Sequence, residues 1–61
     1  MSIRLLAIEL YKAIKQVQEL QNKLQDATLT AAQRQHLENQ LRTMTAERDR
    51  IKSILEGAKA L

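Results

Sequence analysis

The chain has 61 residues, which is enough for one small domain but too few to bury a large core by itself. It contains no cysteine, so disulfides and thiolate metal sites are excluded, and oligomerisation is the usual means of stabilisation that remains. Ten basic and seven acidic side chains give a net charge of +3. Proline is absent and glycine occurs once, a composition typical of helices.

Residues 3–27 carry an apolar heptad seam, in which apolar positions recur at alternating spacings of three and four. Such a seam is the stripe that one helix presents to a partner helix. Ser2 offers a side-chain oxygen that suits an N-cap. We therefore predict a first helix over residues 2–27. The seam residues are Ile3, Leu6, Leu10, Ala13, Val17, Leu20, Leu24 and Ala27.

The first half of this helix is also apolar outside the seam, whereas from Gln16 onward the other positions are polar. A helix that is apolar on several faces is normally covered on several faces. The pattern therefore predicts an interface beyond the first helix pair. The extra apolar residues are Leu5, Ala7, Ile8, Tyr11 and Ile14.

A break in the helix is expected close to Thr30. Thr30 and Gln33 match a capping box, in which each side chain binds the other residue's backbone amide. We predict a turn at residues 28–30 and a second helix over residues 31–57, with Gly57 as a candidate C-terminal cap and a frayed end beyond it. The second seam is out of register with the first, which a turn explains directly. Its residues are Arg34, Leu37, Leu41, Met44, Arg48, Ile51, Leu55 and Ala58.

The two seams match when the chain folds back on itself. Leu6 then pairs with Leu55, and the turn falls where the capping box places it. The extra apolar residues of the second helix, Ile54 and Leu61, come to lie beside those of the first. The sequence predicts an all-α, two-helix antiparallel coiled-coil hairpin, a single domain over residues 1–61, that assembles as a homodimer into a four-helix bundle. One continuous helix with a three-residue stammer is the alternative.

The sequence predicts no catalytic residue, cofactor site or metal site. His36 falls at a solvent-facing helical position, with no second ligand at metal-binding spacing. The seven carboxylates are scattered along the chain, and a two-helix hairpin offers no cleft for an acid/base pair. We therefore expect a protein that is not an enzyme.

Arg48 is a charged residue in the second seam, opposite the small Ala13. One interpretation is that its methylenes lie over Ala13 while the guanidinium reaches outward, towards Glu9 or Gln16. The other is that a polar seam residue fixes the helix register and the oligomeric state. The first interpretation is favoured, and both remain open at this stage.

The expected function is that of a self-associating helical interaction module, either an assembly adaptor or a regulator, in the cytoplasm. A second copy is the expected cover for the extra apolar residues, with a dimer favoured, and a helix of another protein is an alternative. Insertion at a membrane surface is less favoured, and no run of about twenty apolar residues exists that would span a bilayer.

A small dimeric RNA- or DNA-binding regulator is the alternative function. Arg42 and Arg50 are its weak candidate contacts. The basic residues alternate with acidic ones instead of forming a stripe, and no aromatic residues are interleaved with them for base stacking. Nucleic acid is therefore a possible partner that the sequence does not favour.

Overall fold

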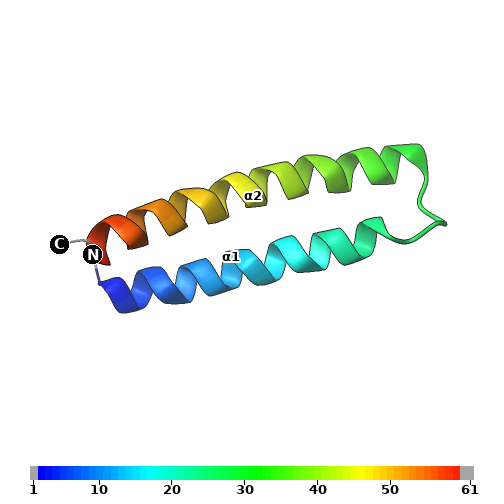
Figure 1. Cartoon of the computed structure of the whole chain (residues 1–61). Helices are drawn as coiled ribbons and strands as arrows, with labels where there is room; N and C mark the ends of the chain where they lie inside the picture. The colour runs from blue at the N-terminus through cyan, green and yellow to red at the C-terminus, as the bar shows by residue number, and fades with distance from the viewer. Residues whose placement is uncertain (1, 60–61) are drawn as a thin grey trace.

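A computed structural model describes residues 2–59 of the chain. Helix α1 (Ile3–Leu24) and helix α2 (Ala31–Lys59) pack side by side in opposite directions, joined at one end by residues 25–30 (Figure 1). Over the described range no strand is present, and the Cα atoms occupy 47 × 14 × 14 Å. The predicted all-α helical hairpin is confirmed, and the alternative of one continuous helix is wrong.

The core of the hairpin is the predicted pair of seams. Every residue that is buried among residues 2–59 is an apolar seam residue, and Leu10 and Met44 pack half-buried against this core. The seam residue Ile3 is not buried, because it lies in the first turn of α1, where it stays 47% exposed. The buried residues are Leu6, Ala13, Val17, Leu20, Ile51 and Leu55.

The first helix begins as predicted but ends one turn early. The Ser2 hydroxyl oxygen accepts a hydrogen bond of 3.2 Å from the amide of Arg4, which confirms the N-cap. α1 ends at Leu24 instead of residue 27, so Ala27 is exposed in the connection and is not a seam residue. The helix stops there because tighter i to i+3 bonds replace the helical ones: the amides of Gln25 and Asp26 bind carbonyls three residues back, each at 3.2 Å.

Side chains, and neither glycine nor proline, hold the turn. Asp26 Oδ1 accepts hydrogen bonds from the Thr28 amide at 2.9 Å and from the Thr28 hydroxyl at 2.7 Å. These bonds lower the pKa of Asp26, the bond from the Thr28 hydroxyl most strongly. The capping box is confirmed, since Gln33 Oε1 lies 2.9 Å from the Thr30 amide and Thr30 Oγ1 lies 3.1 Å from the Gln33 amide.

The second helix is longer than the sequence predicted. Gly57 lies within α2, which continues to Lys59, so the prediction of a glycine cap at this position is wrong. Gly57 does not have the positive φ of a left-handed cap residue. The predicted fraying from Ala58 onward is wrong as far as Lys59, and the last two residues fall outside the described chain.

Candidate interaction surface

The most distinctive surface of the hairpin is apolar and lies at the end where the helices begin and finish. The large apolar side chains that stay exposed between Ser2 and Lys59 are 37% to 62% accessible, with Tyr11 the most exposed. We call this set the apolar surface. Its members are Ile3, Leu5, Ile8, Tyr11, Ile14 and Ile54.

The structure keeps most of the predicted interface residues together at this end. Leu5, Ile8 and Tyr11 lie on α1 outside its buried stripe, and the smaller Ala7 beside them is exposed as well. Leu61, also predicted for the interface, lies outside the described residues. Ile3 is a predicted seam residue whose exposure was not expected, since a seam position at the open end of a hairpin has no further turn to cover it.

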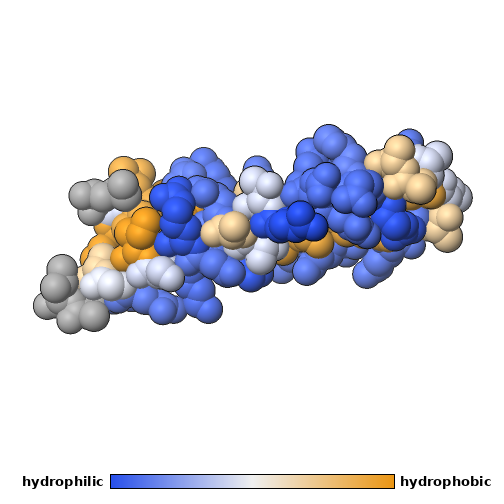
Figure 2. Space-filling model, turned by 90° about the horizontal axis from the view of Figure 1, so that it is seen from above, coloured by the Kyte–Doolittle hydropathy of each residue, from blue (hydrophilic) through white to orange (hydrophobic). Residues whose placement is uncertain are grey.

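The view onto α2 shows the same division of the molecule. Figure 2 looks down on α2, whose outward face is hydrophilic over most of its length, and strongly apolar atoms gather at the end where the helices begin and finish. The exposed member of the apolar surface on α2 is Ile54. The remaining members belong to α1.

The positive charge of the chain is concentrated at the same end. The terminal half, defined as residues 2–15 and 47–59, holds seven basic and four acidic side chains, whereas the turn half, residues 16–46, holds three of each. On α1 the Lys12 ammonium lies 3.6 Å from the Glu9 carboxylate, and the Lys15 ammonium lies 5.7 Å from the centre of the Tyr11 ring. The apolar surface is therefore bordered by exposed, mainly basic side chains.

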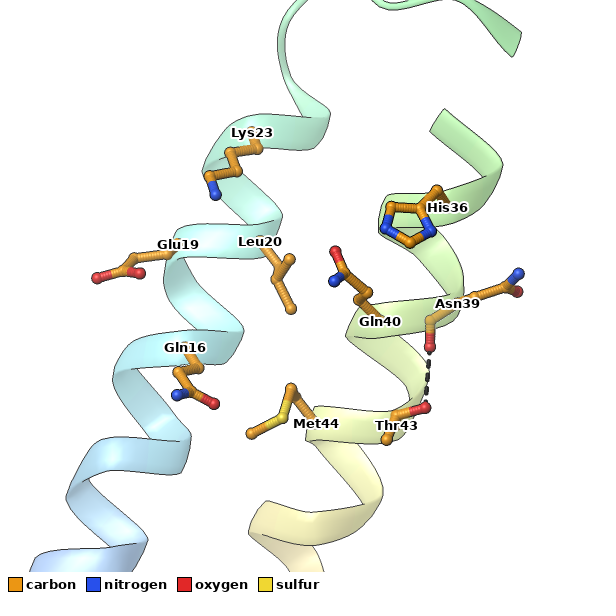
Figure 3. A pocket seen from close by; sticks show the side chains of 9 residues that line it. All are labelled: Gln16, Glu19, Leu20, Lys23, His36, Asn39, Gln40, Thr43 and Met44. Atoms are coloured by element: carbon orange, nitrogen blue, oxygen red, sulfur yellow. Dashed lines mark hydrogen bonds between the residues drawn. The ribbon is translucent and has the colours of Figure 1, made fainter. Parts of the chain in front are cut away.

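A polar groove runs between the helices in the turn half (Figure 3). Leu20 and Met44 point into the space between the helices, the Gln16 and Gln40 amides lie beside them, and Glu19 points away. The residues that line the groove come from both helices, and they do not bring a nucleophilic side chain and a general base together. They are Gln16, Glu19, Leu20, Lys23, His36, Asn39, Gln40, Thr43 and Met44.

The structure gives His36 no neighbours suited to holding a metal. It is exposed, and no group of three or more His, Cys, Asp or Glu side chains that could bind a metal ion occurs in residues 2–59. In the same range no helix is both long enough and apolar enough to cross a bilayer.

Arg48 stays at the edge of the core, as its seam position predicts, but its partner differs from the one expected. Its side chain is 34% exposed, and its Nε and Nη2 atoms lie 3.1 and 3.0 Å from Asp49 Oδ1. The expectation that it reaches Glu9 or Gln16 is wrong, because the guanidinium binds the carboxylate of the adjacent Asp49 on α2 instead. A role for Arg48 in fixing the register stays a prediction.

The two candidate nucleic-acid contacts differ in their surroundings. The Arg50 guanidinium donates hydrogen bonds to both carboxylate oxygens of Glu47, with the Nε–Oε2 distance at 3.2 Å. This pairing lowers the pKa of Glu47 and raises that of Arg50. Arg42 is exposed on α2. Arg50 is thus locally neutralised and offers less to a phosphate than its charge alone indicates.

Comparison of the chain with models of known protein families, with curated proteins and with solved structures found no match. The functional conclusions therefore depend on the geometry of the hairpin and its surface.

Proposed function

We propose that the protein is a non-enzymatic, self-associating helical interaction module that functions as a homodimer in the cytoplasm. The observation that carries this proposal is the apolar surface, which the hairpin alone leaves open to water. A second copy of the chain covers it, and the two hairpins together form a bundle of four helices.

The size of the apolar surface supports association. A large side chain has roughly 200 Å² of accessible surface, so six that are about half exposed leave roughly 600 Å² of apolar area uncovered. For comparison, the largest apolar patch on a typical monomer covers about 300–600 Å², so the summed area of these six side chains reaches the upper end of that range. It is also most of the roughly 800 Å² that each partner contributes to a standard interface.

The small core supports the same proposal. Six buried side chains, one of them the alanine Ala13, form the whole buried core of the described hairpin. Domains near this length without disulfides or metals commonly depend on oligomerisation for stability. Covering the apolar surface would add to the apolar area that is removed from water.

Sedimentation tests the proposal directly. The wild-type chain is expected to be a dimer at micromolar concentration. Ile14→Asp should dissociate it, because burying an unpaired carboxylate in an apolar contact costs several kcal/mol. Gln21→Asp is the matched control, since it occupies the same helical position one heptad later and should leave the dimer intact. A folded wild-type monomer at every concentration would contradict self-association.

A dimeric RNA- or DNA-binding regulator is the second candidate, and the positive charge of the terminal half is the observation that favours it. Titration with structured RNA and duplex DNA at physiological salt distinguishes the two functions. Binding tighter than the roughly micromolar level of non-specific contacts, and lost in an Arg42→Ala, Arg50→Ala double variant, would favour this candidate. We expect no such binding.

A further inference from the structure

We infer that the second copy contacts the outer face of α1 over its first half, so that α1 packs against α1 of the other copy and the contact ends before Gln18. This inference depends on the proposed self-association. The contact that it describes is smaller than the interface of a four-helix bundle to which both helices of each hairpin contribute equally.

The distribution of exposed apolar residues between the helices is the first reason. Five of the six members of the apolar surface lie on α1 and one lies on α2. Four of the five follow one another at intervals of three, so each lies beside the next along a stripe that winds about half-way round α1. These stripe residues are Leu5, Ile8, Tyr11 and Ile14. Ile14, at the end of this stripe, lines a groove beside α2 with Leu10 and Arg48.

A comparison within α1 defines where the contact stops. Residues that are seven or fourteen positions apart lie on nearly the same side of a helix. Each stripe residue is followed at these intervals by a polar or charged residue. Leu5 is succeeded by Lys12 and then Glu19, and Ile8 by Lys15 and then Asn22. Gln18 and Gln21 succeed Tyr11 and Ile14 after one heptad. The cover therefore extends over the first half of the helix and no further.

The apolar area is the reason for choosing a second copy as the occupant, and the charge around it does not prevent that contact. At about 200 Å² for each side chain, the four stripe residues leave roughly 400 Å² exposed, about half of the roughly 800 Å² that each partner contributes to a standard interface. The charges that border it, such as Lys12 at 64% side-chain exposure and Glu9 at 59%, are exposed at its rim and can remain in water when it is covered. Repulsion between the two basic ends is then weak and screened by salt, whereas an acidic partner or an anionic lipid surface would be attracted by the same charges.

The tyrosine provides a label-free test on the full-length chain. Tyr11 is the single tyrosine, and the chain has no tryptophan or phenylalanine, so tyrosine emission reports on the centre of the stripe alone. We expect acrylamide quenching of this emission to fall roughly twofold or more across the dimer transition measured by sedimentation, as Tyr11 passes from 62% exposed to buried. A dimer in which Tyr11 remains equally open to the quencher would overturn this inference while the proposed function stands. A chain that stays monomeric would overturn both.

A pair of variants at one helical position provides the second test. Ile8→Asp should weaken the dimer by at least roughly 100-fold, since it puts a charge in the centre of the contact. Asn22→Asp, two heptads later, should change the dissociation constant by less than about threefold. Circular dichroism at equal concentration shows whether each variant remains helical. Equal effects of the two variants would contradict a contact that ends before Gln18.

The response to salt separates the second copy from an anionic occupant. Dimerisation should keep its strength or become tighter as salt rises, because salt screens the repulsion between the basic ends. Vesicles of zwitterionic and anionic phospholipid, added to the protein below its dimer transition, should leave Tyr11 quenching unchanged. Protection of Tyr11 by anionic vesicles that is lost at high salt, without dimerisation at higher protein concentration, would assign the stripe to a membrane surface instead.

Discussion

Arg34 is a charged residue at a seam position, and its side chain closes the end of the other helix. Its Nη1 atom donates a hydrogen bond of 3.0 Å to the carbonyl of Leu24, the last residue of α1, and its Nη2 atom lies 3.4 Å from the carbonyl of Asp26. The last carbonyls of a helix have no partner within that helix. A cation at this position also opposes the partial negative charge of the helix C-terminus. Arg34 therefore links the start of α2 to the end of α1.

Replacing Arg34 by methionine should destabilise the hairpin by about 1–2 kcal/mol. Methionine keeps an unbranched apolar stem but loses the donors and the charge, so the change removes both the bonds to the two carbonyls and the cation at the end of α1. Urea unfolding at one fixed protein concentration measures the effect. Arg42→Met, on the exposed surface of α2, is the control and should change the free energy of unfolding by less than about 0.5 kcal/mol. Equal losses in both variants would contradict a specific role of Arg34 at the end of α1, since any exposed arginine would then give the same effect.

The Asp26 carboxylate should make the turn sensitive to acid. Its pKa is lowered in the folded chain by the bonds from Thr28, so the unfolded chain binds a proton more readily at this group. The stabilisation is present at neutral pH and is lost as the pH falls below about 4, through the folded pKa.

Thr28→Ala should raise the pKa of Asp26 towards its ordinary value, because it removes the hydroxyl bond that lowers this pKa most. A carboxyl NMR titration measures the shift. Thr43→Ala is the matched control, since the Thr43 hydroxyl binds the carbonyl of Asn39 within α2 and not Asp26. An unchanged titration of Asp26 in Thr28→Ala would contradict this account of the turn.

At the scale of the helices, Gly57 is a position where a substitution should stabilise α2. It lies inside α2 with an ordinary helical sign of φ, and a Cβ added there would have no atom within 4 Å. Gly57→Ala should raise the free energy of unfolding by about 0.5–1 kcal/mol, because glycine loses more backbone freedom than alanine in a helix. Denaturant unfolding measures the gain. Ala46→Gly, at an exposed position of the same helix, should cause a loss of similar size.

The seams and the capping box could be predicted because both are local and periodic. Helix burial repeats every three or four residues, so the apolar spacing alone identified the buried face. Thr30 and Gln33 are three residues apart, which brings their reciprocal bonds within the range of a short motif.

The features that could not be predicted depend on distant or competing partners. The carbonyls that bind Arg34 are eight and ten residues away and come together only after the chain has turned. The early end of α1 reflects competition, since the Asp26 side chain binds Thr28 and favours a turn over one more helical turn. Ala27 fits the apolar spacing of the seam, so the pattern contained no sign that α1 ends before it. The proposed occupant of the apolar surface is a second molecule, so the periodicity of one chain identifies the surface and not what covers it.

At the scale of the whole molecule, folding and association should be coupled. The hairpin buries few side chains by itself, so its melting temperature should depend on protein concentration. A hundredfold increase in concentration should raise the wild-type melting temperature by roughly 10 °C. Thermal melts followed by circular dichroism measure this rise. Ile14→Asp, which cannot associate, should melt at a lower temperature that does not change with concentration, and a flat wild-type profile would contradict the coupling.

The two ends of the described chain, Ser2 and Lys59, lie together at the end of the hairpin that carries the apolar surface (Figure 1). An affinity tag or fluorescent protein fused to either terminus would therefore lie next to the proposed dimer contact and should hinder it. The opposite end offers a better place for such additions. Residues 25–30 form a connection there that is exposed except at the half-buried Leu29, some 40 Å away along the hairpin at about 1.5 Å per helical residue. An insertion between Thr28 and Leu29 would interrupt neither the Asp26–Thr28 bonds nor the capping box. Experiments on association should accordingly carry their labels in the turn.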